Sequence, residues 1–151
     1  MPFNCMLWNC LLPDKTSIGE GKQKARLERR TGAGECILVF RIDNAEFRRQ
    51  FGLSQSPLCD ALFFLGQQQD HPTLLPVELK GSDIAKAVQQ LESAVNLLLS
   101  KLPKKQTRYV PVIVTSSRVP HQAKKLFKDF SRKFGFEVRV SRDGNLRDFL
   151  Q

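Results

Sequence analysis

The sequence predicts an α/β fold in which a mixed sheet of four to five strands is flanked by helices. Residues 35–43 are rich in β-branched and aromatic residues, residues 61–65 are apolar on both faces, and residues 74–80 carry Leu75, Val77 and Leu79 on one face, each of which is typical of a strand. Residues 84–102 then carry apolar side chains at helical spacing, and a strand, a helix and a strand follow. Adjacent strands followed by crossover helices predict one sheet with both antiparallel and parallel pairs.

Length and composition predict one domain over residues 1–151. The chain is 41% hydrophobic and 26% charged, which is ordinary for a folded protein and argues against wholesale disorder. Residues 1–16 are expected to form an N-terminal arm that packs on the domain or on a second subunit, because they lack a basic leader and are too short to span a bilayer. The four cysteines lack zinc-site spacing, so reduced thiols and a cytoplasmic location are expected.

The positive charge is concentrated in a basic C-terminal part, residues 104–151. Residues 1–100 contain 11 Lys/Arg and 11 Asp/Glu, whereas residues 101–151 contain 13 Lys/Arg and 4 Asp/Glu, a net charge of +9. A localised positive surface favours a polyanionic partner. The alternative is that this charge serves solubility.

The first half of the chain is expected to contain a helix and then strands. Residues 17–30 predict a polar helix that ends at a glycine turn, and residues 35–43 predict a strand. One helical turn is expected near residues 46–51. Residues 61–65 are apolar throughout, which is typical of a central strand, and residues 66–73 are expected to form a loop.

The second half alternates strands and helices. The start of the strand of residues 74–80 should lie at a sheet edge or a bulge, because Pro76 lacks an N–H. Ser82 and Asp83 should cap the helix of residues 84–102. A strand at 109–115, an amphipathic helix at 120–134 and a last strand at 136–140 complete the expected order.

Two carboxylates and a lysine adjoin the apolar strands. Glu78 and Lys80 project to the same side of their strand, and Asp60 begins the preceding one. In an antiparallel hairpin, Asp60 joins them only if it pairs with Glu78 or Lys80 and not with Leu79. Close carboxylates favour a hard cation such as Mg²⁺ or Mn²⁺, and Lys80 could orient water or neutralise charge on a phosphate. The alternative is a surface Glu–Lys pair beside an unrelated aspartate.

With Asp60 and Val77-Glu-Leu-Lys-Gly81, the sequence resembles the PD-(D/E)xK nuclease superfamily. Leu58-Cys59 stands where the family name has a proline. The resemblance covers residues 19–116 by element order and implies a restriction-endonuclease-like core, αβββαβ, here with a C-terminal αβ. It also implies that Asp60 and Glu78 bind metal, that Lys80 is catalytic and that the Leu79 carbonyl is a further ligand. Glu20 or Glu28 could add a carboxylate, and Gln90 or Gln89 an accessory amide.

Other residues could bind nucleic acid. Ser116, Arg118 and His121 lie in a polar segment after the fourth strand, where a solvated loop is the simpler interpretation. The basic helix positions could follow a nucleic-acid backbone or form an ordinary solvated face; they are Lys124, Lys125, Lys128, Arg132 and Lys133. Arg26, Arg29 and Arg30 are weaker candidates, and Cys59 is expected to be a buried thiol and not a nucleophile.

The combined prediction is a Mg²⁺-dependent endonuclease that hydrolyses DNA phosphodiester bonds and has no membrane partner. By family analogy, a homodimer would allow both strands to be cut. The alternatives are a non-catalytic nucleic-acid-binding module on the same fold and an RNA-directed nuclease.

Overall fold

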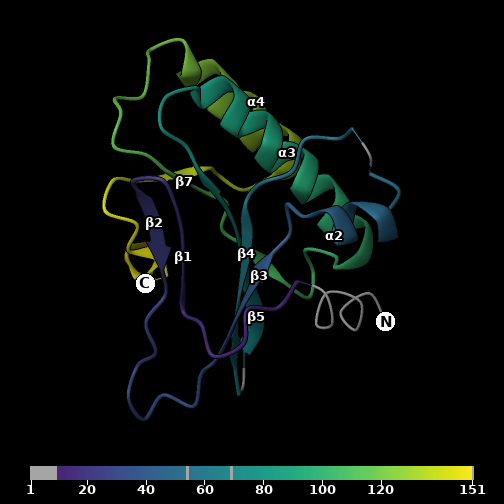
Figure 1. Ribbon diagram of the computed structural model, residues 1–151, viewed down its shortest axis with the longest axis vertical. Coiled ribbons are helices and arrows are strands. Elements are labelled where there is room, and N and C mark those ends of the chain that lie inside the picture. Colours follow the sequence, from purple (N-terminus) through teal and green to yellow (C-terminus); the bar gives the residue numbers. More distant parts are fainter. Residues whose placement is uncertain (1–9, 54, 69, 151) are drawn as a thin grey trace.

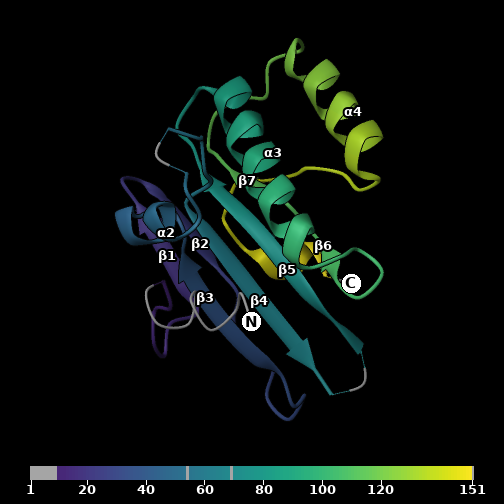
Figure 2. The ribbon, with the colours of Figure 1, turned by 90° about the vertical axis from the view of Figure 1, so that its right-hand side faces the viewer.

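A mixed, open sheet of six strands forms the centre of the protein in a computed structural model that describes residues 10–53, 55–68 and 70–150 (Figures 1 and 2). The strands are β3 (Cys36–Arg41), β4 (Ala61–Gln67), β5 (Asp70–Leu79), β6 (Arg108–Tyr109), β7 (Val112–Val114) and β8 (Arg139–Ser141). β3, β4 and β5 are antiparallel neighbours, and β7 and β8 continue from β5 in parallel. The predicted mixed α/β sheet is confirmed, and the segment expected as one strand at 109–115 is divided into β6 and β7.

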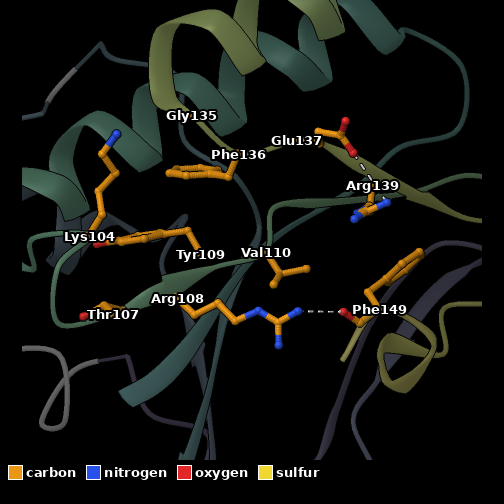
Figure 3. Close-up of a pocket in the computed structure, with 10 residues that line it drawn as sticks. All are labelled: Lys104, Thr107, Arg108, Tyr109, Val110, Gly135, Phe136, Glu137, Arg139 and Phe149. Carbon is orange, nitrogen blue, oxygen red and sulfur yellow. Dashed lines mark hydrogen bonds and ion pairs between the residues drawn. The ribbon is translucent and has the colours of Figure 1, made fainter. Parts of the chain in front are cut away.

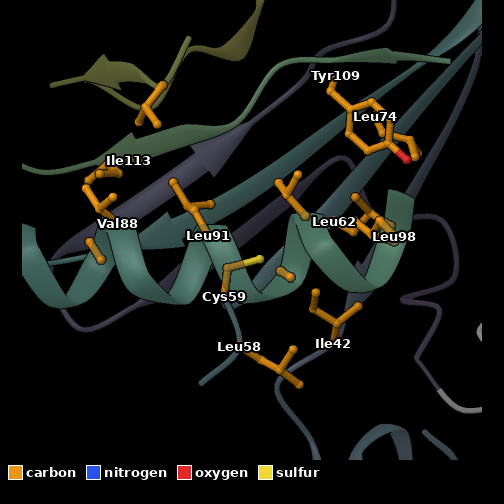
Figure 4. Packing of buried hydrophobic residues seen from close by; sticks show 14 of the residues in the cluster. Ile42, Leu58, Cys59, Leu62, Leu74, Val88, Leu91, Leu98, Tyr109 and Ile113 are labelled. Carbon is orange, nitrogen blue, oxygen red and sulfur yellow. The ribbon is translucent and has the colours of Figure 1, made fainter. Parts of the chain in front are cut away.

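All three described α-helices pack on one face of this sheet. They are α2 (Ala45–Gln50), α3 (Ile84–Lys101) and α4 (Ala123–Phe134). Val88, Leu91 and Leu98 of α3 belong to the same buried cluster as strand residues Leu62 and Leu74 (Figure 4). As predicted, Asp83 caps α3, since its side chain accepts a hydrogen bond from the Lys86 N–H.

A β-hairpin and the C-terminal turn cover the opposite face. The hairpin consists of β1 (Ser17–Glu20) and β2 (Gln23–Arg26), and the turn is the 3₁₀-helix η1 (Leu146–Phe149). Ile18 and Ala25 share a buried cluster with Val77 and Leu146. In Figure 1 the sheet is seen close to edge-on, with the hairpin and C-terminus on one side and α2 and α3 on the other.

The helix predicted over residues 17–30 is wrong. Ala25 and Leu27 are two residues apart, which is the spacing of one strand face and not of one helix face. Both are fully buried, and Gly21, with φ of 58°, allows the tight turn between β1 and β2. Packing of these apolar residues against the sheet therefore outweighs the polar, helix-compatible composition.

Two expectations about the β4–β5 region are also wrong. Residues 66–73 do not form an open loop, because β4 continues to Gln67 and β5 begins at Asp70. Pro76 lies at neither an edge nor a bulge, since it pairs with Leu62 of β4 in the central strand β5. β5 pairs with β6 through Thr73 and Leu74 and with β7 from Val77 onward. The missing N–H of Pro76 therefore falls at the break between β6 and β7, where proline is tolerated.

The described end of the N-terminal arm lies along β3. The Arg41 N–H donates to the Cys10 carbonyl at 2.8 Å, and the Leu12 N–H donates to the Val39 carbonyl at 2.8 Å. This pairing covers part of the outer edge of the sheet. Residues 1–9 of the expected arm lie outside the described residues. Within the described ranges, no helix combines the length and apolar character needed to cross a bilayer.

Candidate active site at the end of β4 and β5

The register of β4 and β5 brings Asp60 and Glu78 together. Ala61 pairs with Val77, so the next position outward sets Asp60 opposite Glu78, as the alternation argument required. The Asp60 N–H donates to Glu78 Oε2 at 3.1 Å, and the Leu79 N–H donates to Asp60 Oδ2 at 2.8 Å. Each carboxylate is therefore held by the backbone of the other strand.

Lys80 directly follows β5 and contacts Glu78 of this pair. Its Nζ is 3.9 Å from Glu78 Oε1 and 3.4 Å from Gln90 Oε1, to which it donates a hydrogen bond. Gln90 Nε2 in turn donates to the Leu58 carbonyl at 3.2 Å, just before Asp60 in sequence. Of the two glutamines considered, Gln90 thus reaches the lysine, whereas Gln89 is exposed.

The two carboxyl groups lie in a poorly solvated environment. Glu78 is 2% exposed and Asp60 is 9% exposed. Burial, with a smaller contribution from the Asp60 charge, raises the pKa of Glu78 to about 8, although Lys80 opposes this rise. Burial also raises the pKa of Asp60 to about 6, against the hydrogen bond from Leu79. At neutral pH the site thus carries less negative charge than its residues suggest, and added positive charge would favour full ionisation.

Glu20 brings a third carboxyl group to the site. It ends β1 on the inner face of the hairpin, beside buried Ile18, and hydrogen bonding between its carboxyl group and that of Asp60 raises the pKa of Asp60. The other alternative, Glu28, lies beyond β2 with an exposed side chain 3.9 Å from Arg26. The structure therefore brings Glu20, and not Glu28, to the Asp60–Glu78 pair.

Asp43 is a nearby carboxylate that the sequence argument did not select. It follows β3, and its charge raises the pKa of both Asp60 and Glu78. Arg48 Nη2 lies 2.9 Å from Asp43 Oδ1 and partly compensates this charge. In the sequence, Asp43 is the last residue of the strand predicted at 35–43. Because β3 and β4 are antiparallel, with Arg41 opposite Ala61, this end of β3 lies near Asp60.

The donor set is compatible with Mg²⁺ in type but is sparse. Carboxylate oxygens of Asp60 and Glu78 are ligands that Mg²⁺ prefers, and the ion commonly keeps several waters and uses only one or two carboxylates. The Leu79 carbonyl faces the same side as its N–H, toward Asp60, and could add an oxygen. Within the described ranges, no group of three His, Cys, Asp or Glu side chains is close enough to hold a metal ion.

The segment after β7 borders the site through Gly81. Thr115 Oγ1 donates to the Gly81 carbonyl at 3.3 Å, and Ser117 Oγ donates to the same oxygen. Ser116 Oγ accepts a hydrogen bond from Gln23 Nε2 at 3.3 Å, so this segment also contacts the hairpin. Arg118 and His121 are exposed, and neither side chain has a hydrogen bond or ion pair among the described residues.

The predicted basic helix is only partly neutralised. Lys133 pairs with Glu92, and Arg132 Nη1 lies 4.0 Å from Asp129 Oδ1. The remaining basic positions on α4 are exposed and unpaired within the described part of the chain; they are Lys124, Lys125 and Lys128. The positive surface on this helix is therefore centred on its first two turns.

A cavity of about 450 Å³ lies at the other end of the sheet, away from this site (Figure 3). It lies beside the beginnings of β7 and β8, and none of the predicted site residues lines it. Its cations are already engaged: Lys104 Nζ donates to the Phe134 carbonyl at 2.7 Å, Arg108 Nη2 donates to the Phe149 carbonyl at 3.4 Å, and Arg139 Nη1 lies 3.6 Å from Glu137 Oε2.

Cys59 does not provide a nucleophile beside Asp60. Its side chain is completely buried, and burial raises the pKa of the thiol well above its ordinary value. The thiol therefore stays protonated, as expected for a structural cysteine.

No protein-family model, curated protein or solved structure matches this chain. The geometry and chemistry of the site are therefore the basis for inferring a function.

Proposed function

We propose that this protein is a Mg²⁺-dependent endonuclease of the PD-(D/E)xK type that hydrolyses DNA phosphodiester bonds. The observation that carries the proposal is the reciprocal hydrogen bonding of Asp60 and Glu78 across β4 and β5, with Lys80 beside them. Two carboxylates and a lysine at one strand end match the motif that the sequence resembles. The β1–β2 hairpin stands where that family's core has its first helix.

The residues of the site divide the required tasks. Asp60, Glu78 and the Leu79 carbonyl would hold Mg²⁺ or Mn²⁺, with Glu20 supporting Asp60, and the bound ion would supply Lewis-acid stabilisation of charge on the phosphate. Lys80 provides an ammonium group that can orient the attacking water and neutralise charge on the phosphoryl oxygens. Gln90 holds the lysine in place.

The basic surfaces favour a nucleic-acid substrate over a small phosphate ester. Lys124, Lys125 and Lys128 are exposed without carboxylate partners among the described residues, and Arg118 precedes them in the segment after β7. Such cations bind the sugar-phosphate backbone without reading base sequence. DNA is the proposed substrate, and RNA is the competing substrate to be tested with it.

A second candidate function is non-catalytic nucleic-acid binding on the same fold. It is favoured by the lack of three clustered metal-binding side chains among the described residues. The two functions differ in their dependence on metal, since a binding module needs neither a divalent cation nor an intact carboxylate pair.

Cleavage assays distinguish the candidates. The purified protein is incubated with linear, nicked, branched and single-stranded DNA and with RNA, in Mg²⁺, Mn²⁺ or EDTA. We expect Mg²⁺-dependent DNA cleavage that is lost in Asp60→Asn and Lys80→Ala and retained in Asp129→Asn, which removes an exposed carboxylate on α4.

The isosteric asparagine can still accept the Leu79 hydrogen bond, so lost activity would not reflect a lost fold. Cleavage that survives in both site variants would overturn the assignment of the site. DNA binding without cleavage in any metal, unchanged in Asp60→Asn, would support the binding module instead.

A further inference from the structure

The β1–β2 hairpin has two chemically different faces. Cross-strand pairs place Ile18 with Ala25 and Glu20 with Gln23, so these four residues share the inner face. Ile18 and Ala25 are buried against the sheet, Gln23 Nε2 donates to Ser116 Oγ at 3.3 Å, and Glu20 lies near enough to Asp60 to raise its pKa. The inner face thus joins the core at one end and the candidate active site at the other.

The outer face and the turn carry positive charge. Alternation places Lys24 and Arg26 on the outer face with Ser17 and Gly19, and Lys22 lies in the turn. Arg26 is already used, because its Nη1 donates to the Asp143 carbonyl at 2.9 Å. Lys22 and Lys24 are exposed, and neither ammonium group has a hydrogen bond or ion pair among the described residues.

These lysines lie close to the carboxylates along the chain. Lys22 is two residues from Glu20, so their Cα atoms are at most about 7 Å apart. Figures 1 and 2 both place the hairpin turn at the end of the sheet where β5 finishes. A Cβ added at Gly21 would meet no atom within 4 Å, so nothing packs on the outside of this turn residue.

The negative charge of the site would repel a polyanion. A polyanion that reaches Asp60 also approaches Glu20, Asp43 and Glu78, and their negative charge opposes its arrival. Unpaired ammonium groups next to this cluster would offset that repulsion and attract phosphate groups. The lysines on α4 belong to the opposite face of the sheet and serve a different part of the surface.

We propose that the β1–β2 hairpin is a phosphate-binding arm, in which Lys22 and Lys24 contact the DNA backbone beside the bond held at Asp60 and Glu78. The inner face of the same hairpin carries Glu20. One hairpin would therefore both bind the DNA backbone and bring a carboxyl group to Asp60 and Glu78. This inference rests on the proposed function for the identity of the ligand.

The test measures DNA binding separately from cleavage. A fluorescein-labelled DNA duplex is titrated with the Asp60→Asn protein in EDTA at several salt concentrations, and the titration is repeated with Lys22→Ala/Lys24→Ala added. We expect affinity to fall about tenfold at low salt, and the slope of log K against log salt to decrease by about one for each lysine that contacts a phosphate.

A charge-matched control separates local contact from net charge. Lys101→Ala/Lys105→Ala removes two exposed lysines, one at the C-terminal end of α3 and one just beyond it, and should leave the salt slope unchanged. Lys22→Arg/Lys24→Arg should restore binding. Thermal melting of all of these variants should match that of the Asp60→Asn protein, because every lysine substituted in addition is exposed.

The outcomes distinguish this inference from the proposed function. Equal salt slopes for the two alanine pairs would show that the hairpin lysines do not bind DNA, and would not affect the proposal that the unmodified protein cleaves it. A selective loss in Lys22→Ala/Lys24→Ala supports the arm even if cleavage is never seen. Failure of the Asp60→Asn protein and the unmodified protein to bind any duplex overturns both.

Discussion

At the scale of single residues, the site combines burial with like charge. Glu78 is 2% exposed, next to Asp60 and within the field of Asp43. Structural ion pairs usually lower the pKa of a carboxyl group, but here burial raises the pKa of Glu78 to about 8. Ionisation of these two carboxyl groups therefore destabilises the fold, although the proposed metal-dependent reaction would need them ionised. Strongly shifted pKa values of this kind are common at functional sites.

Glu78→Gln should remove this pH-dependent destabilisation. An unfolded glutamate ionises near pH 4.5, whereas folded Glu78 keeps its proton until about pH 8. Unfolding therefore releases a proton between these values, and the free energy of unfolding should fall by up to about 1.4 kcal/mol per pH unit as pH rises. Urea denaturation from pH 5 to 8.5 should show Glu78→Gln gaining stability relative to the unmodified protein.

Exposed Glu137→Gln is the control for that comparison and should follow the unmodified protein at every pH. Mg²⁺ at pH 8 should stabilise the unmodified protein and have less effect on Glu78→Gln, because bound cation favours the ionised carboxylates. A stability difference that stays constant from pH 5 to 8.5 would show that Glu78 ionises without penalty in the fold.

Gln90 offers a second residue-scale prediction, through its bridge between Lys80 and the Leu58 carbonyl. Gln90→Ala should lower kcat by about 10- to 100-fold with little change in KM, since misplaced catalytic groups slow chemistry more than binding. Gln89→Ala is the matched control, because the adjacent side chain is exposed. Equal kcat values in steady-state cleavage assays would show that Gln90 has no positioning role.

The sequence allowed part of this arrangement to be predicted. Alternation placed Glu78 and Lys80 on one side of β5, and the required partner of Asp60 followed from the same rule. Glu20 was selected only together with Glu28, because the choice depends on a hairpin that was predicted as a helix. Asp43 was missed because its proximity depends on how β3 pairs with β4, which no local pattern specifies.

At the scale of elements, predictability followed the strength of the local pattern. Helix α3 has apolar residues at helical spacing and an aspartate cap, so its limits could be predicted closely. The strands β1 and β2 have only four residues each, and their apolar side chains are few. Their conformation is determined by packing on the sheet and on the C-terminal segment, which are distant in sequence.

Gly144 shows how closely the C-terminal segment approaches β2. The Arg26 N–H donates to the Gly144 carbonyl at 2.8 Å, and a Cβ at Gly144 would lie 1.7 Å from the Lys24 carbonyl oxygen. No side chain fits there without separating the two backbones. The segment that follows β8 therefore holds the hairpin against the sheet.

Gly144→Ala should consequently destabilise the protein more than Gly32→Ala. Both glycines have φ of 75°, but a Cβ at Gly32 would meet no atom within 4 Å. Gly32→Ala should cost about 1–2 kcal/mol from backbone strain alone, and Gly144→Ala about 1–3 kcal/mol more from the clash. Equal free energies of unfolding in urea titrations would show that β2 is not tightly held by this segment.

At the scale of the whole molecule, the two faces of the sheet divide the structural tasks. The helical face supplies Gln90, and the opposite face supplies Glu20 through the hairpin. The two contributions meet at the end of β4 and β5. Residues distant in sequence must therefore be fixed together for the site to exist, and Arg147 provides one such connection.

Arg147 joins the C-terminal segment to the region between β2 and β3. Its Nη1 donates to Glu35 Oε1 at 2.9 Å, its Nη2 pairs with Glu35 Oε2, and its Nε donates to the Glu28 carbonyl at 2.9 Å. The Glu35 side chain is 1% exposed and that of Arg147 is 14% exposed. Such a bidentate pair is geometrically specific, and loss of one partner leaves the other charge without compensation.

Glu35→Gln should therefore reduce stability in a way that disappears in acid. The hydrogen bond from Arg147 lowers the pKa of Glu35 to about 2 from an ordinary value of 4.5, so its contribution is complete above about pH 4.5 and is lost as pH falls toward 2. We expect a loss of about 3 kcal/mol at pH 7 in urea denaturation and a much smaller difference near pH 2.5. Glu46→Gln, which affects an exposed ion pair with Arg49, is the control and should change stability little at either pH. A deficit for Glu35→Gln that is the same at both pH values would show that shape, and not charge, holds the C-terminal segment in place.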